Sequence, residues 1–502
     1  MMGSLLETYV ESAVWVRWLA LAVPAAPLLA ALLLGALVML GRELEEREVA
    51  WIAGVGVGVS FVASLGTAAA FLARGALALE VHFGSLYEVD GHRFTLELLV
   101  DRLSIAMVLT TGLVTALVAR FSVRYLHRDP GFLRYFVLLC VFDAGMQLLV
   151  LAGSYDLLFI GWEMVGLSSF MLITFFQLRD GPARAGLRAF VTYRITDVGL
   201  LVAGVLLHQA TGSSELEAAF GSGAWPHATT HLDAAATTPI ALALLVSTIG
   251  KSALFPASGW LPRAMEGPTP SSALFYGALS VHAGIYLLLR SAPLFETTTI
   301  GALAVIVIGA LTVLTSTLAG RVQSDIKSAL AYATSSQVGL MAIGVGVAAL
   351  TRSGLLAMSV VVYLVAHAFL RTLQLLRAPS ALRDAQEIAA ALPDVRRGPR
   401  PVSHVLSDRT RAALYRLAHH RFFLDELLDR LVVGPVVALA RGADQLERRW
   451  VAALSGLAVH EQERHGPRAH RDETLARASR RDDDLHAPRS TTTIEAEKAG
   501  HA

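Results

Sequence analysis

The stretch Thr238–Pro270 constrains the fold of this chain more than any other, and it reads TPIALALLVSTIGKSALFPASGWLPRAMEGPTP. It begins with an apolar run long enough to enter a bilayer, yet Lys251 lies well inside that run and Pro256 follows five residues later. A proline removes the hydrogen bond to the carbonyl four residues back, here that of Ser252, beside the lysine. Hydrocarbon does not accommodate a free carbonyl or an ammonium, so both must face protein or trapped water. The stretch therefore predicts an ion path through a membrane protein.

Lysine is rare in this chain. The 42 Lys and Arg residues include only Lys251, Lys327 and Lys498 as lysines. Arginine stays protonated in proteins, whereas a desolvated lysine can lose its proton near neutral pH. A mid-membrane lysine in such a chain indicates that release of a proton matters at Lys251. The alternative is a structural cation that pairs with a buried carboxylate.

The composition is that of a polytopic membrane protein rather than a soluble enzyme. The 502 residues are 54% hydrophobic, with a mean hydropathy of +0.54. The single cysteine, Cys140, excludes an internal disulfide and any all-cysteine metal or iron–sulfur site. The sequence has no Rossmann or Walker fingerprint, and close helix packing explains the glycines of Gly54–Gly58. We therefore expect no nucleotide, redox centre or other cofactor in this chain, although it can still be a subunit of an enzyme complex.

Apolar runs predict an all-α fold with about eleven membrane-spanning helices. The runs lie near Val16–Leu40, Val49–Leu72, Ser104–Phe121, Tyr135–Gly153, Leu157–Phe176, Thr192–His208, Thr238–Phe255, Ser272–Leu289, Ile300–Leu318, Ala329–Leu350 and Leu355–Leu376. One set of loops carries most of the positive charge, at Arg42, Arg47, Arg124, Arg128, Arg179, Arg184, Arg188, Arg263, Arg321 and Lys327. This asymmetry predicts that the N-terminus lies outside and that the region after Leu376 lies in the cytoplasm. We expect the membrane to be the inner membrane of a bacterium.

The chain is expected to divide into four regions. Residues 1–100 hold the first spans and, at Leu77–Leu98, an alternating pattern around Asp90-Gly91 that predicts an external β-hairpin. Residues 101–380 form the membrane core. Residues 381–460 combine a basic segment with an amphipathic helix, and residues 461–502 are polar and expected to be disordered.

The third of these regions has two features that favour binding. Arg396, Arg397 and Arg400 suit anionic lipid headgroups or a partner protein. The segment Phe422–Leu454 is amphipathic and helical in pattern, but its charge-free stretch is too short to span, so we expect it in the membrane interface.

Acidic residues inside the spans are candidates for chemistry. Glu163 lies in the middle of an apolar helix, and a glutamate beside Lys251 would be ionised, with each proton affecting the other group. Asp197 and Arg194 form a within-helix pair that is either structural or tunes the path. Asp143 is a further buried acid whose partner is not evident from the sequence.

Histidines supply the remaining candidates. His282 titrates near neutral pH and is placed to take a proton from Lys251, the alternative being a neutral core histidine. His367 and Arg371 lie one turn apart on one helix face, where histidine suits a relay and arginine a fixed counter-ion. Asp325 and Lys327 mark a helix start that is either a capped, solvated end or functional.

Five segments occur in one order: GWEMVGLSSFML, FVTYRITDVGLL, GKSALFPASGWLPRAMEGPTPSSAL, SDIKSALAYATSSQVGLM and AHAFLRTLQLL. Together they resemble the antiporter-like subunits of complex I, the subunit L or subunit 5 family shared with Mrp antiporters, over about Asp101–Ser380. The resemblance implies a core of inverted helical repeats with discontinuous helices and a proton path that uses a Glu–Lys pair. By motif match the pair is Glu163 and Lys251, with Asp197 and His367 as accessories.

Three features depart from the family pattern. Tyr276 stands where the family has a histidine after PTPxSAL, with His282 further along. Arg371 replaces the central lysine of the later broken helix, and the chain leaves the membrane after Leu376, where complex I subunits continue with further helices. The second half-channel is therefore expected to be incomplete.

The departures leave three functional interpretations. A shortened chain of this kind resembles the DabB membrane subunits, whose partner is the large cytoplasmic zinc protein DabA and which serve energy-coupled uptake of inorganic carbon, bicarbonate or CO₂. The motifs themselves favour a proton-translocating subunit L or 5 of an NADH-quinone oxidoreductase-like respiratory complex, beside other membrane subunits, or an Mrp-type antiporter. A non-conducting scaffold is the third, supported by Arg371.

Overall fold

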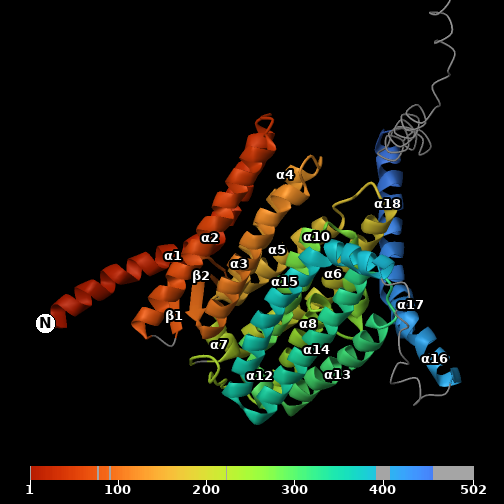
Figure 1. Cartoon of the computed structure of the whole chain (residues 1–502). Helices are drawn as coiled ribbons and strands as arrows, with labels where there is room; N and C mark the ends of the chain where they lie inside the picture. Colours follow the sequence, from red (N-terminus) through yellow and green to blue (C-terminus); the bar gives the residue numbers. More distant parts are fainter. Residues whose placement is uncertain (1, 76–77, 90–91, 222, 392–407, 456–502) are drawn as a thin grey trace, which may run out of the picture. The chain divides into compact units, whose positions relative to one another are not determined.

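The computed structural model describes residues 2–75, 78–89, 92–221, 223–391 and 408–455 (Figure 1). The chain divides into two compact units, Met1–Asp429 and Arg430–Ala502. The first unit contains the long apolar helices and a two-stranded β-hairpin. The second contributes helix α18 (Gly434–Ser455). The predicted basic segment with Arg396, Arg397 and Arg400, and the region 461–502, lie outside the described residues.

Eleven segments of the described chain are long and apolar enough to cross a membrane, which confirms the expected polytopic all-α fold. They are α1 (Met2–Met39), α2 (Glu46–Arg74), α3 (Arg102–Tyr125), α4 (Phe132–Leu151), α5 (Tyr155–Ile173), α6 (Asp180–Thr211), α8 (Ala234–Lys251), the composite span Thr269–Arg290, α13 (Thr299–Gly320), α14 (Ile326–Thr351) and α15 (Gly354–Ala391). Helical spans satisfy the backbone hydrogen bonds internally, as hydrocarbon requires.

Short helices connect or follow these spans. They are α7 (Leu216–Phe220), η1 (Ala257–Gly259), α9 (Trp260–Arg263), η2 (Ala264–Glu266), α12 (Ala292–Thr297), α16 (Asp408–His419), η5 (Arg421–Phe423), α17 (Leu424–Leu428) and η6 (Asp429–Val433). The predicted amphipathic segment Phe422–Leu454 is thus helical, although it is divided among several elements.

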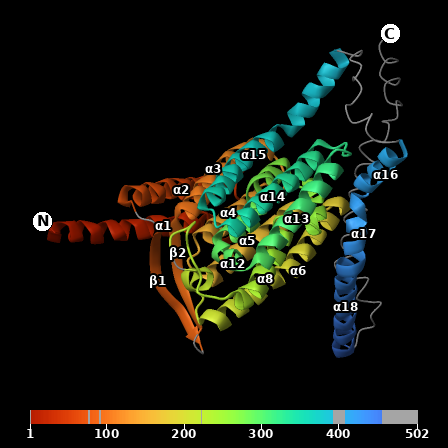
Figure 2. The same cartoon turned by 90° about the horizontal axis from the view of Figure 1, so that it is seen from below.

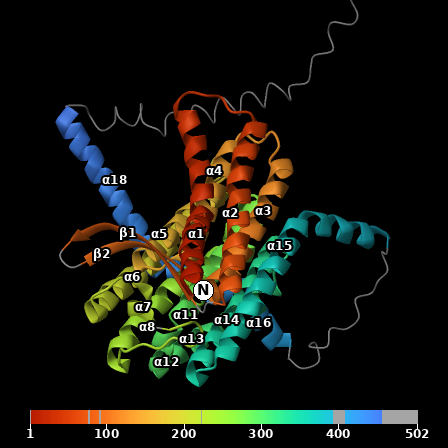
Figure 3. The same ribbon diagram turned by 90° about the vertical axis from the view of Figure 1, so that its left-hand side faces the viewer.

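Small residues let neighbouring spans approach closely, because no side chain separates their backbones. A Cβ on Gly309 of α13 would lie 2.7 Å from the carbonyl oxygen of Gly339 of α14. Helices α1 to α4 also pack on one another (Figure 3). In the cluster Gly54–Gly58, Gly56 alone makes the expected close contact, with a Cβ position 2.5 Å from that of Ala30, whereas Gly54 and Gly58 face open space.

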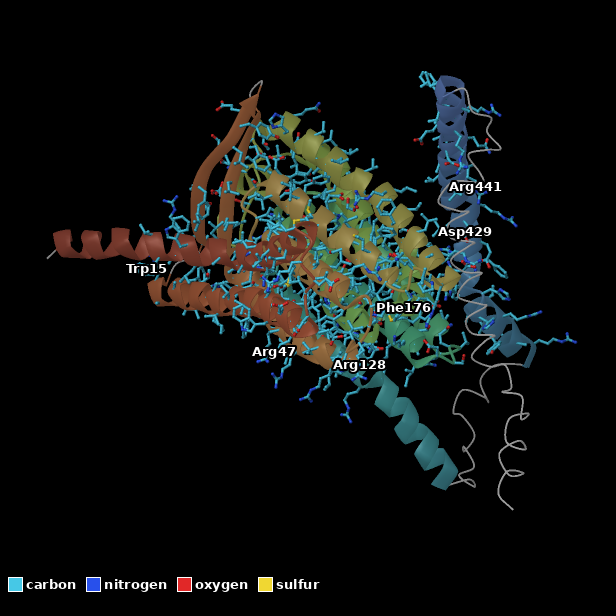
Figure 4. The ribbon with its side chains drawn as sticks, turned by 90° about the horizontal axis from the view of Figure 1, so that it is seen from above. Trp15, Arg47, Arg128, Phe176, Asp429 and Arg441 are labelled. Carbon is cyan, nitrogen blue, oxygen red and sulfur yellow. The ribbon has the colours of Figure 1, made fainter. Side chains whose placement is uncertain are left out.

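The loops predicted to be basic lie at one end of the helices. Arg47 and Arg128 are close together at this end in Figure 4, and the Glu46 carboxylate accepts a 2.7 Å hydrogen bond from the Arg128 backbone. The loop between α5 and α6 lies at the same end, because Arg134 at the start of α4 donates a 2.8 Å hydrogen bond to the carbonyl of Phe175. The charge pattern therefore grouped these three loops correctly.

The predicted hairpin is present. Strand β1 (Ala78–Val89) pairs antiparallel with β2 (His92–Asp101), from Ala78 opposite Asp101 to Val89 opposite His92 (Figure 2). Asp101 then caps α3 and forms a buried ion pair with Arg290, whose Nη2 lies 3.0 Å from Oδ1. Burial opposes ionisation of Asp101, but Arg290 and Ser104 outweigh it and hold the pKa of that carboxyl below its usual value. This pair ties the hairpin to the end of the span Thr269–Arg290.

The chain breaks after Lys251, but not by a proline kink. Helix α8 ends at Lys251, Ala253 has a left-handed φ of 50°, and Pro256 lies beyond the end of the helix. Side chains of α13 and α14 bind the broken segment: Thr312 Oγ1 accepts from Phe255 N at 2.8 Å, and Ser335 Oγ donates to the Ala253 carbonyl at 2.9 Å. The free backbone groups next to Lys251 thus arise from the end of a helix.

The composite span Thr269–Arg290 is also irregular. It joins α10 (Thr269–Ser271), a π-helical stretch η3 (Ser272–Leu279) and α11 (Ser280–Arg290), and every described residue in it is buried. The long helix α15 differs from the expectation. The resemblance implied a broken helix around Arg371, but α15 runs without interruption through it, because no glycine or proline lies between Gly354 and Pro379.

Candidate functional site

Lys251 is completely buried at the C-terminal end of α8. Its Nζ donates a 3.1 Å hydrogen bond to the carbonyl oxygen of Trp162. The same atom lies 4.8 Å from the ring centroids of both Trp162 and Tyr193. A desolvated ammonium between two aromatic faces gains cation–π stabilisation. Lys251 is therefore held by a carbonyl and two rings rather than by direct contact with a carboxylate.

Glu163 forms its ion pair with Arg194 of α6, not with Lys251. Arg194 also lies 3.3 Å from Asp197 Oδ2, so it contacts two carboxylates. The expected direct pair of Glu163 and Lys251 is absent from the described residues because the longer arginine reaches the carboxylate from the adjacent helix. Glu163 and Lys251 are still neighbours, since Lys251 is bonded to the carbonyl of the residue that precedes Glu163.

Trp162 connects the two ends of this arrangement. Its Nε1 donates a 2.6 Å hydrogen bond to Asp197 Oδ1, while its carbonyl accepts from Lys251. We call Glu163, Arg194, Asp197 and Lys251, together with Trp162, the Lys251 cluster. Two carboxylates and two cations balance when all four are ionised, and the charges of Asp197 and Glu163 act favourably on that of Lys251.

Sequence reasoning assigned Arg194 only to Asp197 and did not identify Trp162. The pairing of Arg194 with Glu163 crosses between two helices, and no spacing along the chain indicates it. Gly166 is a further contributor, since a Cβ there would lie 2.9 Å from Lys251 Nζ. The glycine leaves room for the ammonium.

His282 and His367 contact each other inside the protein. His282 Nε2 lies 3.0 Å from His367 Nδ1, and His282 Nδ1 contacts the carbonyl oxygen of Ala278. A carbonyl only accepts, so Nδ1 of His282 carries a hydrogen. In the neutral pair, His367 Nδ1 then donates to His282, and His367 Nε2 is an acceptor. That buried nitrogen has no hydrogen-bond partner in the part of the chain that the structure describes.

Arg371 completes what we call the His282 cluster, with His282 and His367. Its charge acts on both imidazoles. Its Nη1 donates to Gln374 Oε1 at 2.8 Å, and within the described residues its guanidinium has no carboxylate partner. His367 and Arg371 both lie near His282, as expected of two residues one turn apart on one helix face, and the hydrogen-bonded pair is His282 with His367.

Direct proton transfer from Lys251 to His282 is not supported by contact. The α11 residue that meets the end of α8 is Gly284, whose Cβ position lies 2.2 Å from Ser252 Oγ. His282 lies two residues earlier and so faces another side of the helix. Several buried hydroxyl groups in the same helices and loops have no hydrogen-bond partner among the described residues: those of Ser169, Ser252 and Ser271.

Three further candidates from the sequence lie outside both clusters. Asp325 caps α14, accepting a 2.7 Å hydrogen bond from Ser328 N, as a capped helix start requires. Lys327 is half-buried and lies 3.4 Å from the carbonyl of Met265, so it binds the irregular segment. Asp143 is fully buried, and the polar side chains beside its carboxyl group are those of Thr115 and Gln147.

Comparisons with known proteins match most of this region. Residues 152–391 match the family described as NADH:quinone oxidoreductase/Mrp antiporter, TM, and residues 87–136 match NADH-ubiquinone oxidoreductase (complex I), chain 5 N-terminus. The chain is 38% identical over 297 residues to NADH-quinone oxidoreductase subunit L of Mycobacterium tuberculosis (strain ATCC 25618 / H37Rv), covering 59% of this chain and 45% of that protein. It is 35% identical over 321 residues to NADH-ubiquinone oxidoreductase chain 5 of Allomyces macrogynus, covering 64% and 49%.

Solved structures are similar as well. The Mrp complex from Dietzia sp. DQ12-45-1b contains a chain with a TM-score of 0.58 and 28% identity, covering 72% of this chain and 37% of that one. An archaeal membrane-bound sulfane sulfur reductase gives a TM-score of 0.58 at 20% identity, covering 72% and 70%, a likeness of fold. The chain spans about half the length of the curated relatives it matches.

Proposed function

We propose that this chain, which belongs to the antiporter-like membrane subunit family of complex I and the Mrp antiporters, conducts protons as one subunit of a multisubunit membrane complex. The observation that carries the proposal is the Lys251 cluster, a charge-balanced set of ionisable groups within spans, in which Lys251 and Asp197 are buried and Glu163 and Arg194 are partly exposed. Ionisable side chains at such depth are costly and are retained for ion pathways. Because we expect no redox centre in this chain, proton movement is proposed to couple to work done by other subunits.

The proton step is assigned to Lys251. Its ammonium is held by the Trp162 carbonyl, while Arg194 occupies the Glu163 carboxylate. If Arg194 moves away, the Glu163 carboxylate loses its partner. Its negative charge then acts on the nearby Lys251 ammonium, which retains its proton. When Arg194 returns, that attraction falls and Lys251 releases the proton. Opposite charges and their removal change proton affinity in this direction.

The route onward is proposed to be hydrated. Buried hydroxyl groups without partners among the described residues, such as those of Ser169, Ser252 and Ser271, are groups that ordered water satisfies in protein interiors. Water bridging them would carry a proton from Lys251 to the His282 cluster without direct contact. His367 Nε2, an acceptor with a free lone pair, is the next point on this route.

We further propose the orientation. The end that carries Arg47 and Arg128 faces the cytoplasm of a bacterial cell, because positively charged loops stay inside. The N-terminus and the hairpin then lie outside, and the protein belongs to the inner membrane. The helices that follow α15 are proposed to lie at the membrane interface.

Two kinds of complex are candidates. The curated relatives are named as respiratory NADH-quinone oxidoreductase subunits and a structural neighbour is an Mrp complex, so a complex with other membrane subunits is the better supported. The unbroken α15 and Arg371 support a second candidate, a DabB-like subunit that lets protons run inward to drive a DabA-like zinc protein in inorganic carbon uptake.

Proton flux in proteoliposomes tests the proposal. An imposed potential should drive acidification that a pH-sensitive dye reports, and Lys251→Ala and Glu163→Gln should each abolish it while the protein still inserts. Glu296→Gln, at a partly exposed glutamate of α12, is the matched control and should conduct normally. Normal flux in Lys251→Ala would contradict the proposal. Absence of flux in the parent protein would favour a non-conducting scaffold.

A growth assay separates the two complexes. Co-expression with the neighbouring soluble gene should restore growth at ambient CO₂ to cells that lack carbonic anhydrase, and a protonophore should abolish the rescue, if the DabB-like reading is right. Failure of the rescue although the two proteins purify together would favour the respiratory complex.

A further inference from the structure

The β-hairpin brings three metal-ligand side chains to one face. Glu80 and His82 are two residues apart on β1, so both project from the same side of the strand. Glu97 on β2 is the cross-strand partner of His82, and directly opposed residues share a face. Pairing of the two strands is therefore sufficient to assemble the set.

The ligand atoms converge. His82 Nδ1 lies 3.5 Å from Glu97 Oε2, and His82 Nε2 lies 3.9 Å from Glu80 Oε2. One such atom from each of the three residues lies within 4.8 Å of the others. Ligands of a tetrahedral ion with bonds of about 2.1 Å are separated by about 3.4 Å. The half-exposed side chains of Glu80 and His82 need only small rotations to reach that geometry.

Glu97 supplies an independent observation. Its side chain is only 6% exposed, and Oε2, the oxygen aimed at His82, has no hydrogen-bond partner in the described chain. Its position is set by the backbone, because Gly153 N donates a 2.8 Å hydrogen bond to the Glu97 carbonyl, and a Cβ on Gly153 would lie 2.6 Å from Glu97 Cγ. A buried, fixed carboxyl oxygen without a partner is costly unless something binds it.

The surroundings concentrate negative charge. Burial, followed by the neighbouring carboxylates Glu80, Glu215 and Glu217, raises the pKa of Glu97 to about 7. Glu215 and Glu217 lie at the start of α7, which borders the hairpin in Figure 1. The nearby cation Arg17 donates instead to the backbone carbonyl of His82, at 2.6 Å. The charged groups that act on Glu97 are all carboxylates.

We propose that Glu80, His82 and Glu97 form a binding site for a divalent transition-metal cation, with Zn²⁺ as the ion that fits this donor set. One imidazole and two carboxylates are common ligands of Zn²⁺. A water molecule or the Glu217 carboxylate completes four-coordination. Ca²⁺ is disfavoured because it takes six to eight oxygen ligands and does not select imidazole. A bound ion joins both strands and, through Glu217, connects them to α7.

The site is tested on the full chain, purified in detergent without a polyhistidine tag. Equilibrium dialysis against chelator-buffered Zn²⁺, with bound metal counted by mass spectrometry, should give about one Zn²⁺ per chain. His82→Asn and Glu97→Gln should weaken binding at least about tenfold. Ca²⁺ in excess should not displace the ion. His127→Asn is the matched control, because among the described residues His127 contacts one carboxylate, Glu46, at 2.7 Å.

A second measurement needs no variant. Carbethoxylation of His82 in the parent protein, located by peptide mass spectrometry, should slow at least about tenfold when Zn²⁺ occupies the site, whereas that of His127 should not. Equal Zn²⁺ binding by the parent and by His82→Asn, or His82 modified at the same rate with and without Zn²⁺, would overturn the proposal. Neither measurement depends on proton flux, so the metal-site proposal can fail without the proton-conduction proposal, and the reverse.

Discussion

The Lys251 cluster and the His282 cluster balance their charges in different ways. The first combines Lys251 and Arg194 with two carboxylates, so that every member has an opposite charge nearby. The second combines two imidazoles, which can be neutral, with Arg371, whose guanidinium donates a hydrogen bond to the side-chain amide of Gln374. A fixed positive charge opposes protonation of the histidines beside it. From this comparison we propose that the Lys251 cluster stores and releases charge, whereas the His282 cluster passes a proton without holding it.

Replacing Lys251 by arginine, and Arg371 by lysine, should give the largest difference in proton flux between the two clusters. Lys251→Arg keeps the charge but loses the capacity to deprotonate, so flux should fall about 100-fold or more. Arg371→Lys should conduct as well as the parent or better. Flux in proteoliposomes, normalised to inserted protein, measures both.

Arg371→Ala is the control for Arg371→Lys in the His282 cluster. Arg371→Ala removes the fixed charge and should disrupt conduction, unlike Arg371→Lys. If Arg371→Ala conducts like the parent, Arg371 is not on the path, and if Lys251→Arg conducts, the distinction between the clusters is wrong.

Crowding the ammonium should give an intermediate effect. Gly166→Ala places a Cβ 2.9 Å from the present position of Lys251 Nζ, so the ammonium must move away from the Trp162 carbonyl. Misplacing a reacting group by a fraction of an ångström should lower flux about tenfold. Gly54→Ala, where a Cβ meets nothing within 4 Å, is the control in another span. An equal loss in both variants would show a general packing defect.

Removing one hydrogen bond should give the smallest effect. Trp162→Phe keeps a ring face and the backbone carbonyl for Lys251 but deletes the 2.6 Å bond to Asp197. A single hydrogen bond contributes about 1 kcal/mol, so flux should fall about threefold to fivefold. Trp225→Phe, which deletes a 2.9 Å bond to the Leu289 carbonyl, should leave flux unchanged. A loss of all flux in Trp162→Phe would mean that the ring itself carries the step.

Partners across helices were the part of the site that the sequence did not predict. Arg194 and Asp197 are three residues apart, which indicates their contact, but the Glu163 partner of Arg194 lies on another helix. Likewise, the spacing of His367 and Arg371 predicts a shared face and says nothing of His282, which is 85 residues away. The expected break in α15 failed because it came from a family pattern, whereas the local residues contain no helix breaker.

The sequence by itself determined the properties that act locally. Apolar length determined the eleven spans, alternation around Asp90-Gly91 predicted the hairpin, and arginine placement grouped the loops at one end. Only the tertiary structure decided that Arg194 rather than Lys251 binds Glu163, and that Glu80, His82 and Glu97 converge. The physical reason is that span formation and strand pairing depend on hydrophobicity and hydrogen bonding within short segments. Which charge meets which depends on how helices distant in the chain pack, and small residues such as Gly166 determine that packing.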